Sequence, residues 1–193
     1  MTNDIDRRWS LAVDTLRRGD KAGALYLFKA LEREGELAAL REIGNIVEFG
    51  GGGVKKDIDA AIAWYKKAVD RANDAYACIG LARIYYYGKG GNRDHEKALW
   101  YLKLIEDKDY PLVNLLLGKM YRYGNGVPQS MERAIEYFEK AVAKGSIHAE
   151  KELGKLQIQR GQFFFGTLLI VRSFFRAVVV GSKNIFDERL KSI

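Results

Sequence analysis

Apolar and small residues return along the chain at steps of 36 to 38 residues. The three clearest series are Ala39, Ala77, Val113 and Ala149; Ile43, Leu81, Leu117 and Leu153; and the small residues Gly44, Ala82, Gly118 and Gly154. Within a period, apolar positions recur at helical spacing, as from Ala61 to Ala68, which predicts an amphipathic helix. A period of this length is typical of solenoids. The pattern therefore predicts pairs of antiparallel helices that share one continuous core with their neighbours.

Turn residues separate the two helices of each predicted pair. A glycine ends the first helix, where a left-handed conformation is easiest for glycine: Gly50, Gly88 and Gly124. A polar residue that can cap the free N–H groups begins the second helix: Asp57, Asp94 and Ser130. The small residue inside the first helix costs helix propensity, so we expect it to permit a close approach of the second helix.

The third period carries the most specific motif, with Leu117–Pro128, Ala134–Ala141 and Gly145 in register. It resembles the Sel1-like repeat, a relative of the tetratricopeptide repeat. The resemblance covers about three units, from Leu37 to Gly154, and implies an all-α, right-handed α-solenoid of antiparallel helix pairs, here followed by a C-terminal apolar helix. We expect a degenerate N-terminal helix pair in residues 1–36, repeats in 37–154, and a final helix with a basic apolar tail in 155–193.

The resemblance also implies a binding scaffold whose first helices line a concave face. Residues just after the small position, and one turn later, are then candidates for a partner-binding groove: Asn45, Glu48, Arg83, Tyr86, Lys119, Arg122 and Lys155. Most are basic, which favours an acidic peptide or another anionic surface. The alternative is that they are ordinary solvated helix faces.

The sequence offers little for catalysis. His95 and His148 are the only histidines, and neither has metal-ligand spacing with Cys78, the lone cysteine. No nucleophile with its base and orienting group is visible, so we expect no enzyme, no metal and no cofactor. A hydrolase of the repeat family remains the alternative of a different class. A single cysteine and a polar N-terminus favour a cytoplasmic protein.

The segment Phe163–Gly181 is the most apolar of the chain. It holds five of the nine phenylalanines, and it is about as long as the roughly 20 residues that span a bilayer. Its apolar side chains gain roughly 4–7 kcal/mol on insertion, but Arg172 and Arg176 cost roughly 5–7 kcal/mol, so an isolated spanning helix is not expected. The net charge of the chain is +7, and residues 155–193 carry seven basic against two acidic residues.

Three interpretations of this tail stay open. It is a capping helix buried against Leu153 and Leu156, or a helix in a membrane interface with its basic residues on lipid phosphates, or a docking helix for another protein, such as an integral membrane protein or a second copy. The residues that would carry the last two roles are Phe163, Phe164, Phe165, Arg172, Phe174, Phe175, Arg176 and Lys183.

Together these features predict an adaptor that binds a protein partner, not nucleic acid. Its tail would recruit that partner to an anionic membrane or a membrane complex, which would place it on the cytoplasmic face. A soluble scaffold with the tail as a cap is the alternative, and self-association through the tail is a further expectation.

Overall fold

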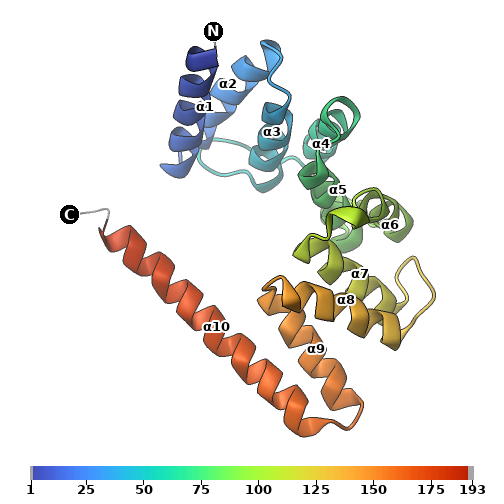
Figure 1. The fold of residues 1–193 in the computed structure, drawn as a ribbon. Coiled ribbons are helices and arrows are strands. Elements are labelled where there is room, and N and C mark those ends of the chain that lie inside the picture. Colours follow the sequence, from blue (N-terminus) through green and yellow to red (C-terminus); the bar gives the residue numbers. More distant parts are fainter. Residues whose placement is uncertain (1, 191–193) are drawn as a thin grey trace. The chain divides into compact units, whose positions relative to one another are not determined.

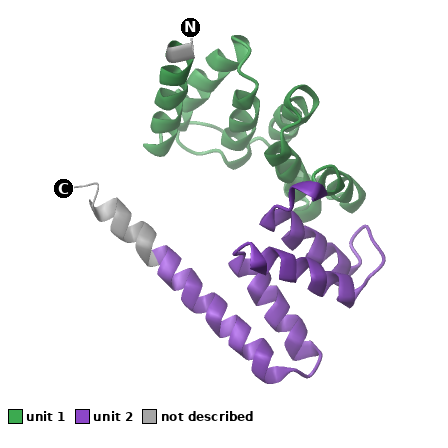
Figure 2. Cartoon of the chain, viewed as in Figure 1, with its two compact units in different colours: residues 1–105 green, residues 106–193 purple. Residues whose placement is uncertain are grey.

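The computed structural model describes the backbone of residues 2–190 and the side chains of residues 4–181. The described residues form ten α-helices and no strand, in two compact units, residues 1–105 and 106–193 (Figure 2). Unit 1 contains α1 (Thr2–Arg17), α2 (Lys21–Arg33), α3 (Ala38–Phe49), α4 (Ile58–Ala72), α5 (Ala75–Tyr87) and α6 (His95–Lys103). Unit 2 contains α7 (Pro111–Tyr123), α8 (Met131–Ala143), α9 (Ile147–Gln159) and α10 (Phe163–Leu190) (Figure 1).

Within each unit, helices that follow one another along the chain pack together. The expected all-α solenoid of helix pairs with a C-terminal apolar helix is confirmed. The division into units falls at Ile105, inside the residues expected to form repeats. The expected segment boundaries at residues 36 and 154 stay predictions.

The caps and turns follow the sequence prediction. Asp57, Asp94 and Ser130 each accept a hydrogen bond from the backbone N–H three residues later, at the start of α4, α6 and α8. Gly88 and Gly124 end α5 and α7 in the left-handed conformation, whereas Gly50 ends α3 at φ 61° and ψ −164°, outside the left-handed helical region. These local interactions fix where each helix of a pair begins and ends.

Close approach of the paired helices is also confirmed. A Cβ atom on Gly44 of α3 would lie 2.7 Å from the ring of Tyr65 on α4. A Cβ on Gly118 of α7 would lie 2.6 Å from the ring of Phe138 on α8. Both aromatic side chains are fully buried. In these two pairs, therefore, a large buried ring fills the space that the glycine leaves.

Candidate interaction surfaces

Helix α10 packs on α9 through its small and polar edge. Gly166 and Ser173 are buried on this edge, and Leu169, Ile170 and Arg176 are half-buried. Leu169 also packs against the core cluster that contains Leu153 and Leu156. The contact with these two leucines is the one expected of a capping helix. It uses few of the large apolar residues of α10, however.

At the centre of this contact the two backbones touch. A Cβ on Gly154 of α9 would lie 2.7 Å from the carbonyl oxygen of Gly166, and a Cβ on Gly166 would lie 2.6 Å from the carbonyl oxygen of Gly154. No side chain larger than hydrogen fits at either position without displacing a helix. The two glycines thus set the distance between α9 and α10.

Beside the glycine contact, a buried carboxylate on α9 pairs with two arginines of α10, Arg172 and Arg176. The side chain of Glu150 on α9 has no exposed surface. Arg176 Nη1 donates to Glu150 Oε2 at 2.8 Å, and Arg176 Nη2 donates to the carbonyl oxygen of Gly145 at 3.2 Å. Arg172 Nε lies 2.9 Å from Glu150 Oε1 as an ion pair without the alignment of a hydrogen bond. The polar edge of α10 therefore faces the protein.

The opposite face of α10 is apolar and exposed. Ten large apolar side chains of α10, on this face and on its flanks, have exposed fractions between 44% and 75%: Phe163, Phe164, Phe165, Leu168, Val171, Phe174, Phe175, Val178, Val179 and Val180. Five of them, Phe164, Leu168, Val171, Phe175 and Val178, recur at alternating steps of four and three residues, which places them on one stripe. We call this stripe the outer face of α10. By length and composition alone, Phe163–Gly181 could cross a membrane, and only 11% of it is buried. Lys183, also predicted for this surface, lies outside the residues whose side chains are described.

In unit 1 the predicted groove residues surround a second buried carboxylate. Glu48 of α3 is buried; its Oε2 accepts from Arg83 Nη2 at 2.6 Å, and its Oε1 accepts from Lys89 Nζ at 2.7 Å. The Tyr65 hydroxyl lies 2.7 Å from both Glu48 Oε2 and Asn45 Oδ1. Burial alone would raise the pKa of Glu48, but the bonds from Lys89 and Tyr65 and the charge of Arg83 outweigh it and lower that pKa. Burial and the same carboxylate raise the pKa of Tyr65.

In unit 2 the position equivalent to Glu48 is Arg122, and it is buried with the opposite charge. Arg122 Nη1 donates to Glu152 of α9 at 2.6 Å, and Nη2 donates to Gln159 at 3.3 Å. Lys155 is half-exposed and also pairs with Glu152, at 2.9 Å. At this repeat position, therefore, an ion pair joins two first helices in both units, Glu48 with Arg83 and Arg122 with Glu152. The remaining groove candidates are Tyr86, which is buried, and Lys119, which is half-buried.

Many of the predicted groove residues form ion pairs between helices of the solenoid. That these residues bind a partner stays a prediction. The first helices do expose another set of side chains, the aromatic residue just before each helix-ending glycine. Phe49, Tyr87 and Tyr123 are 45% to 55% exposed, and Arg83 and Lys89 lie over the Phe49 ring at 5.1 Å. These aromatic residues could have been found from the sequence, because each one directly precedes a helix-ending glycine in its repeat. The groove prediction did not use this recurrence.

No catalytic arrangement emerges from the described residues. Cys78 is buried on α5, and burial raises the pKa of its thiol to about 11, so it is inert as a nucleophile. Among the described side chains, no group of three His, Cys, Asp or Glu residues could hold a metal ion.

The sequence and the fold were compared with those of known proteins. The sequence pattern of the Sel1 repeat matches residues 37–73, 75–110 and 112–146. Among curated proteins, none matches the sequence. The fold is similar to a Sel1 repeat protein from Oxalobacter formigenes (TM-score 0.68, 23% identity), with 81% of this chain and 65% of that chain covered.

Two further solved structures share the fold. One is a protective antigen of uropathogenic Escherichia coli with an SLR fold (TM-score 0.65, 22% identity), with 79% of this chain and 37% of that chain covered. The other is a crystal structure of MamA (TM-score 0.60, 18% identity), with 89% and 96% covered. The chain thus spans less than two thirds of the length of the first two proteins.

Proposed function

The chain belongs to the Sel1 repeat family, and from this premise we propose that it is a non-catalytic scaffold that binds a protein partner and recruits it to a membrane through α10. Sel1 repeats form solenoids that typically mediate protein–protein interaction. The partner would contact the first helices, where exposed aromatic rings stand beside cations, as Phe49 does beside Arg83 and Lys89. Aromatic and arginine side chains are enriched among the residues that contribute most to binding.

The observation that carries the membrane part is the orientation of α10. A helix that only capped the solenoid would turn its large apolar side chains inward and its arginines outward. Here Arg172 and Arg176 turn toward Glu150, and the outer face carries Phe164, Leu168 and Phe175 into solvent. Exposed apolar strips of this extent mark membrane or protein contacts. The basic excess of residues 155–193 would add attraction to an anionic bilayer.

Vesicle co-sedimentation with substituted full-length protein tests this proposal. Truncation before α10 would uncover Glu150 and Leu153, so substitution on the outer face is the cleaner change. The variant Phe164→Ser with Phe175→Ser removes two rings that face away from α9. We expect it to lower the partition onto vesicles with anionic lipid by about tenfold or more, because each ring loses its transfer from water.

A matched control removes the same number of exposed apolar side chains at another site. Leu11→Ser with Tyr26→Ser removes two exposed side chains from α1 and α2, far from α10 in the sequence. This control should bind vesicles as the unchanged protein does. Equal binding of both variants, or no binding of the unchanged protein, would refute recruitment through α10. In the latter case the soluble scaffold would be the better description, with α10 as a cap or a docking helix for another protein.

A further inference from the structure

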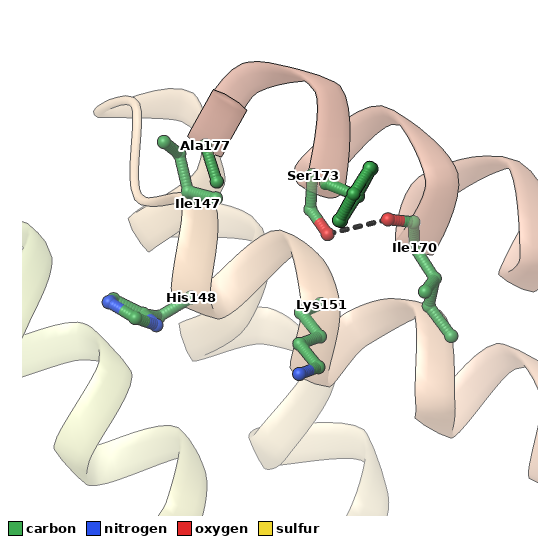
Figure 3. A pocket seen from close by; sticks show the side chains of 7 residues that line it. Ile147, His148, Lys151, Ile170, Ser173 and Ala177 are labelled. Atoms are coloured by element: carbon green, nitrogen blue, oxygen red, sulfur yellow. Dashed lines mark hydrogen bonds between the residues drawn. The ribbon is translucent and has the colours of Figure 1, made fainter. Parts of the chain in front are cut away.

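A pocket lies between α9 and α10, beside the contact described above. Its volume is ≈ 250 Å³, and it is lined by Ile147, His148 and Lys151 of α9 and by Ile170, Phe174 and Ala177 of α10 (Figure 3). The hydroxyl of Ser173, at its wall, donates to the carbonyl oxygen of Ile170 at 2.7 Å, so its proton is already used in a hydrogen bond within the helix. The remaining wall is mostly hydrocarbon.

The polar groups at this pocket are basic. Lys151 is exposed, and among the described side chains none forms an ion pair or a hydrogen bond with it or with His148. The other basic side chains that the structure describes on these two helices form ion pairs: Lys155 with Glu152, and Arg172 and Arg176 with Glu150. An apolar pocket next to an unpaired ammonium group is complementary to a ligand with a hydrocarbon chain and an anionic head.

Size and position select the source of such a ligand. The volume is below the about 300–1,000 Å³ of typical small-molecule sites, so the pocket admits a segment of one hydrocarbon chain and not a cofactor-sized ligand. Phe174 lines the pocket and is also one of the exposed apolar residues of α10. Through Phe174 the pocket therefore borders the exposed apolar surface of α10, on the flank of the helix toward α9.

We propose that this pocket binds one acyl chain of an anionic phospholipid, with Lys151 pairing with the phosphate of its headgroup. The proposal rests on the proposed membrane recruitment through α10 and adds to it a defined lipid site. The chain would pack on Ile147, Ile170 and Phe174, and His148 would stand beside the headgroup as a further hydrogen-bond donor. The scaffold would then recognise individual anionic lipids in addition to the bilayer surface.

Titration calorimetry of the full chain with a soluble lipid tests the site apart from bilayer binding. The probe is dihexanoyl phosphatidylglycerol below its micelle concentration, which we expect to bind saturably with one lipid per chain. Lys151→Gln should weaken this binding about fivefold, the loss of one cation beside a phosphate. The control Lys66→Gln removes the same charge from an exposed position of α4 and should have no effect.

A second variant, Ala177→Phe, fills the pocket from an exposed position of α10. It should abolish saturable lipid binding, while its added apolar surface leaves vesicle binding at least as strong. Equal affinity for dihexanoyl phosphatidylcholine, equal affinity for inorganic phosphate alone, or unchanged binding by Ala177→Phe would each overturn the lipid site.

The two proposals fail in different ways. If vesicles bind but the soluble lipid does not, the pocket assignment is wrong and recruitment through the outer face stands. If the soluble lipid binds one to one but vesicles do not, recruitment is wrong, and the pocket is an anionic-lipid site independent of the bilayer.

Discussion

Replacing Arg172 and Arg176 together by Met should destabilise unit 2 by about 3–5 kcal/mol. Met keeps the length of the side chain and is a good helix former, so the change acts mainly through charge. Glu150 has no exposed surface, and these arginines are the cations that contact it. Without them its carboxylate stays buried and uncompensated, which is the costly way to break a buried pair.

Removing the charge of the carboxylate instead should lower the stability of unit 2 far less. Glu150→Gln leaves two guanidinium groups whose side chains are 63% and 35% exposed, so water can solvate them. The Gln oxygen can still accept from Arg176. We expect a loss of about 1 kcal/mol, as for exposed ion pairs. A triple variant that adds Glu150→Met to the two arginine changes should recover most of the stability, because no charge remains buried.

Urea unfolding followed by two probes separates the units. Trp9, Trp64 and Trp100 are the three tryptophans, and all lie in unit 1, so their fluorescence reports that unit. Far-UV circular dichroism reports the helices of both. The double arginine variant should lose the dichroism of unit 2 at lower urea with an unchanged fluorescence midpoint. A double variant as stable as Glu150→Gln would refute the argument from the buried carboxylate.

Four further outcomes follow from the described residues. The pKa of Glu48 is lowered in the folded protein, so its carboxylate stabilises unit 1 fully above the ordinary glutamate pKa of 4.5 and progressively less as the pH falls through the folded pKa. The urea midpoint of tryptophan fluorescence should therefore drop on acidification below pH 4.5. The drop should be smaller in Glu48→Gln. Gly118→Ala should destabilise unit 2 by about 1–3 kcal/mol, because its Cβ would lie 2.6 Å from the Phe138 ring. By contrast Gly181→Ala, with nothing within 4 Å, should stabilise α10 by up to about 1 kcal/mol, as thermal melts by circular dichroism can measure. Cys78, with a thiol pKa of about 11, should resist iodoacetamide at pH 8 in the folded protein and react once urea unfolds it.

The features that sequence predicted well are those set by local chemistry or by repetition. A cap such as Asp57 needs only the N–H groups of its own helix, and a helix-ending glycine such as Gly124 needs only a positive φ. The close approach at Gly44 and Gly118 was readable because the same small position returns in each repeat. Repetition makes a tertiary contact visible in one sequence.

The buried carboxylates were not predictable in the same way. Glu150 is one acidic residue on an amphipathic helix, and only the position of α10 on α9 brings Arg172 and Arg176 to it. The glycine contact sets that position. Gly166 belongs to a stripe of small residues beside the two arginines, but it lies outside the repeat pattern, so the repeats did not predict its contact with Gly154. Because this contact was not predicted, the sequence suggested Arg172 and Arg176 as contacts for lipid or a partner.

The groove residues illustrate the same limit. Arg83 was expected to be available to a partner, but it pairs with Glu48, which is buried. Exchanging Arg83 for Glu would place a second carboxylate beside Glu48 and destabilise unit 1. It is therefore not a clean test of binding, and Phe49→Ala, at an exposed ring, is the better first substitution.

The contact between Gly154 and Gly166 has a consequence for distance. Helices that touch through glycines lie at the short end of helix spacing, about 8 Å between axes. If the outer face of α10 rests in a bilayer, α9 then lies one helix above it, with no flexible tether between the repeats and the lipid. A partner held by unit 2 would be kept at the level of the lipid headgroups, so the scaffold would select partners that are themselves at the membrane surface.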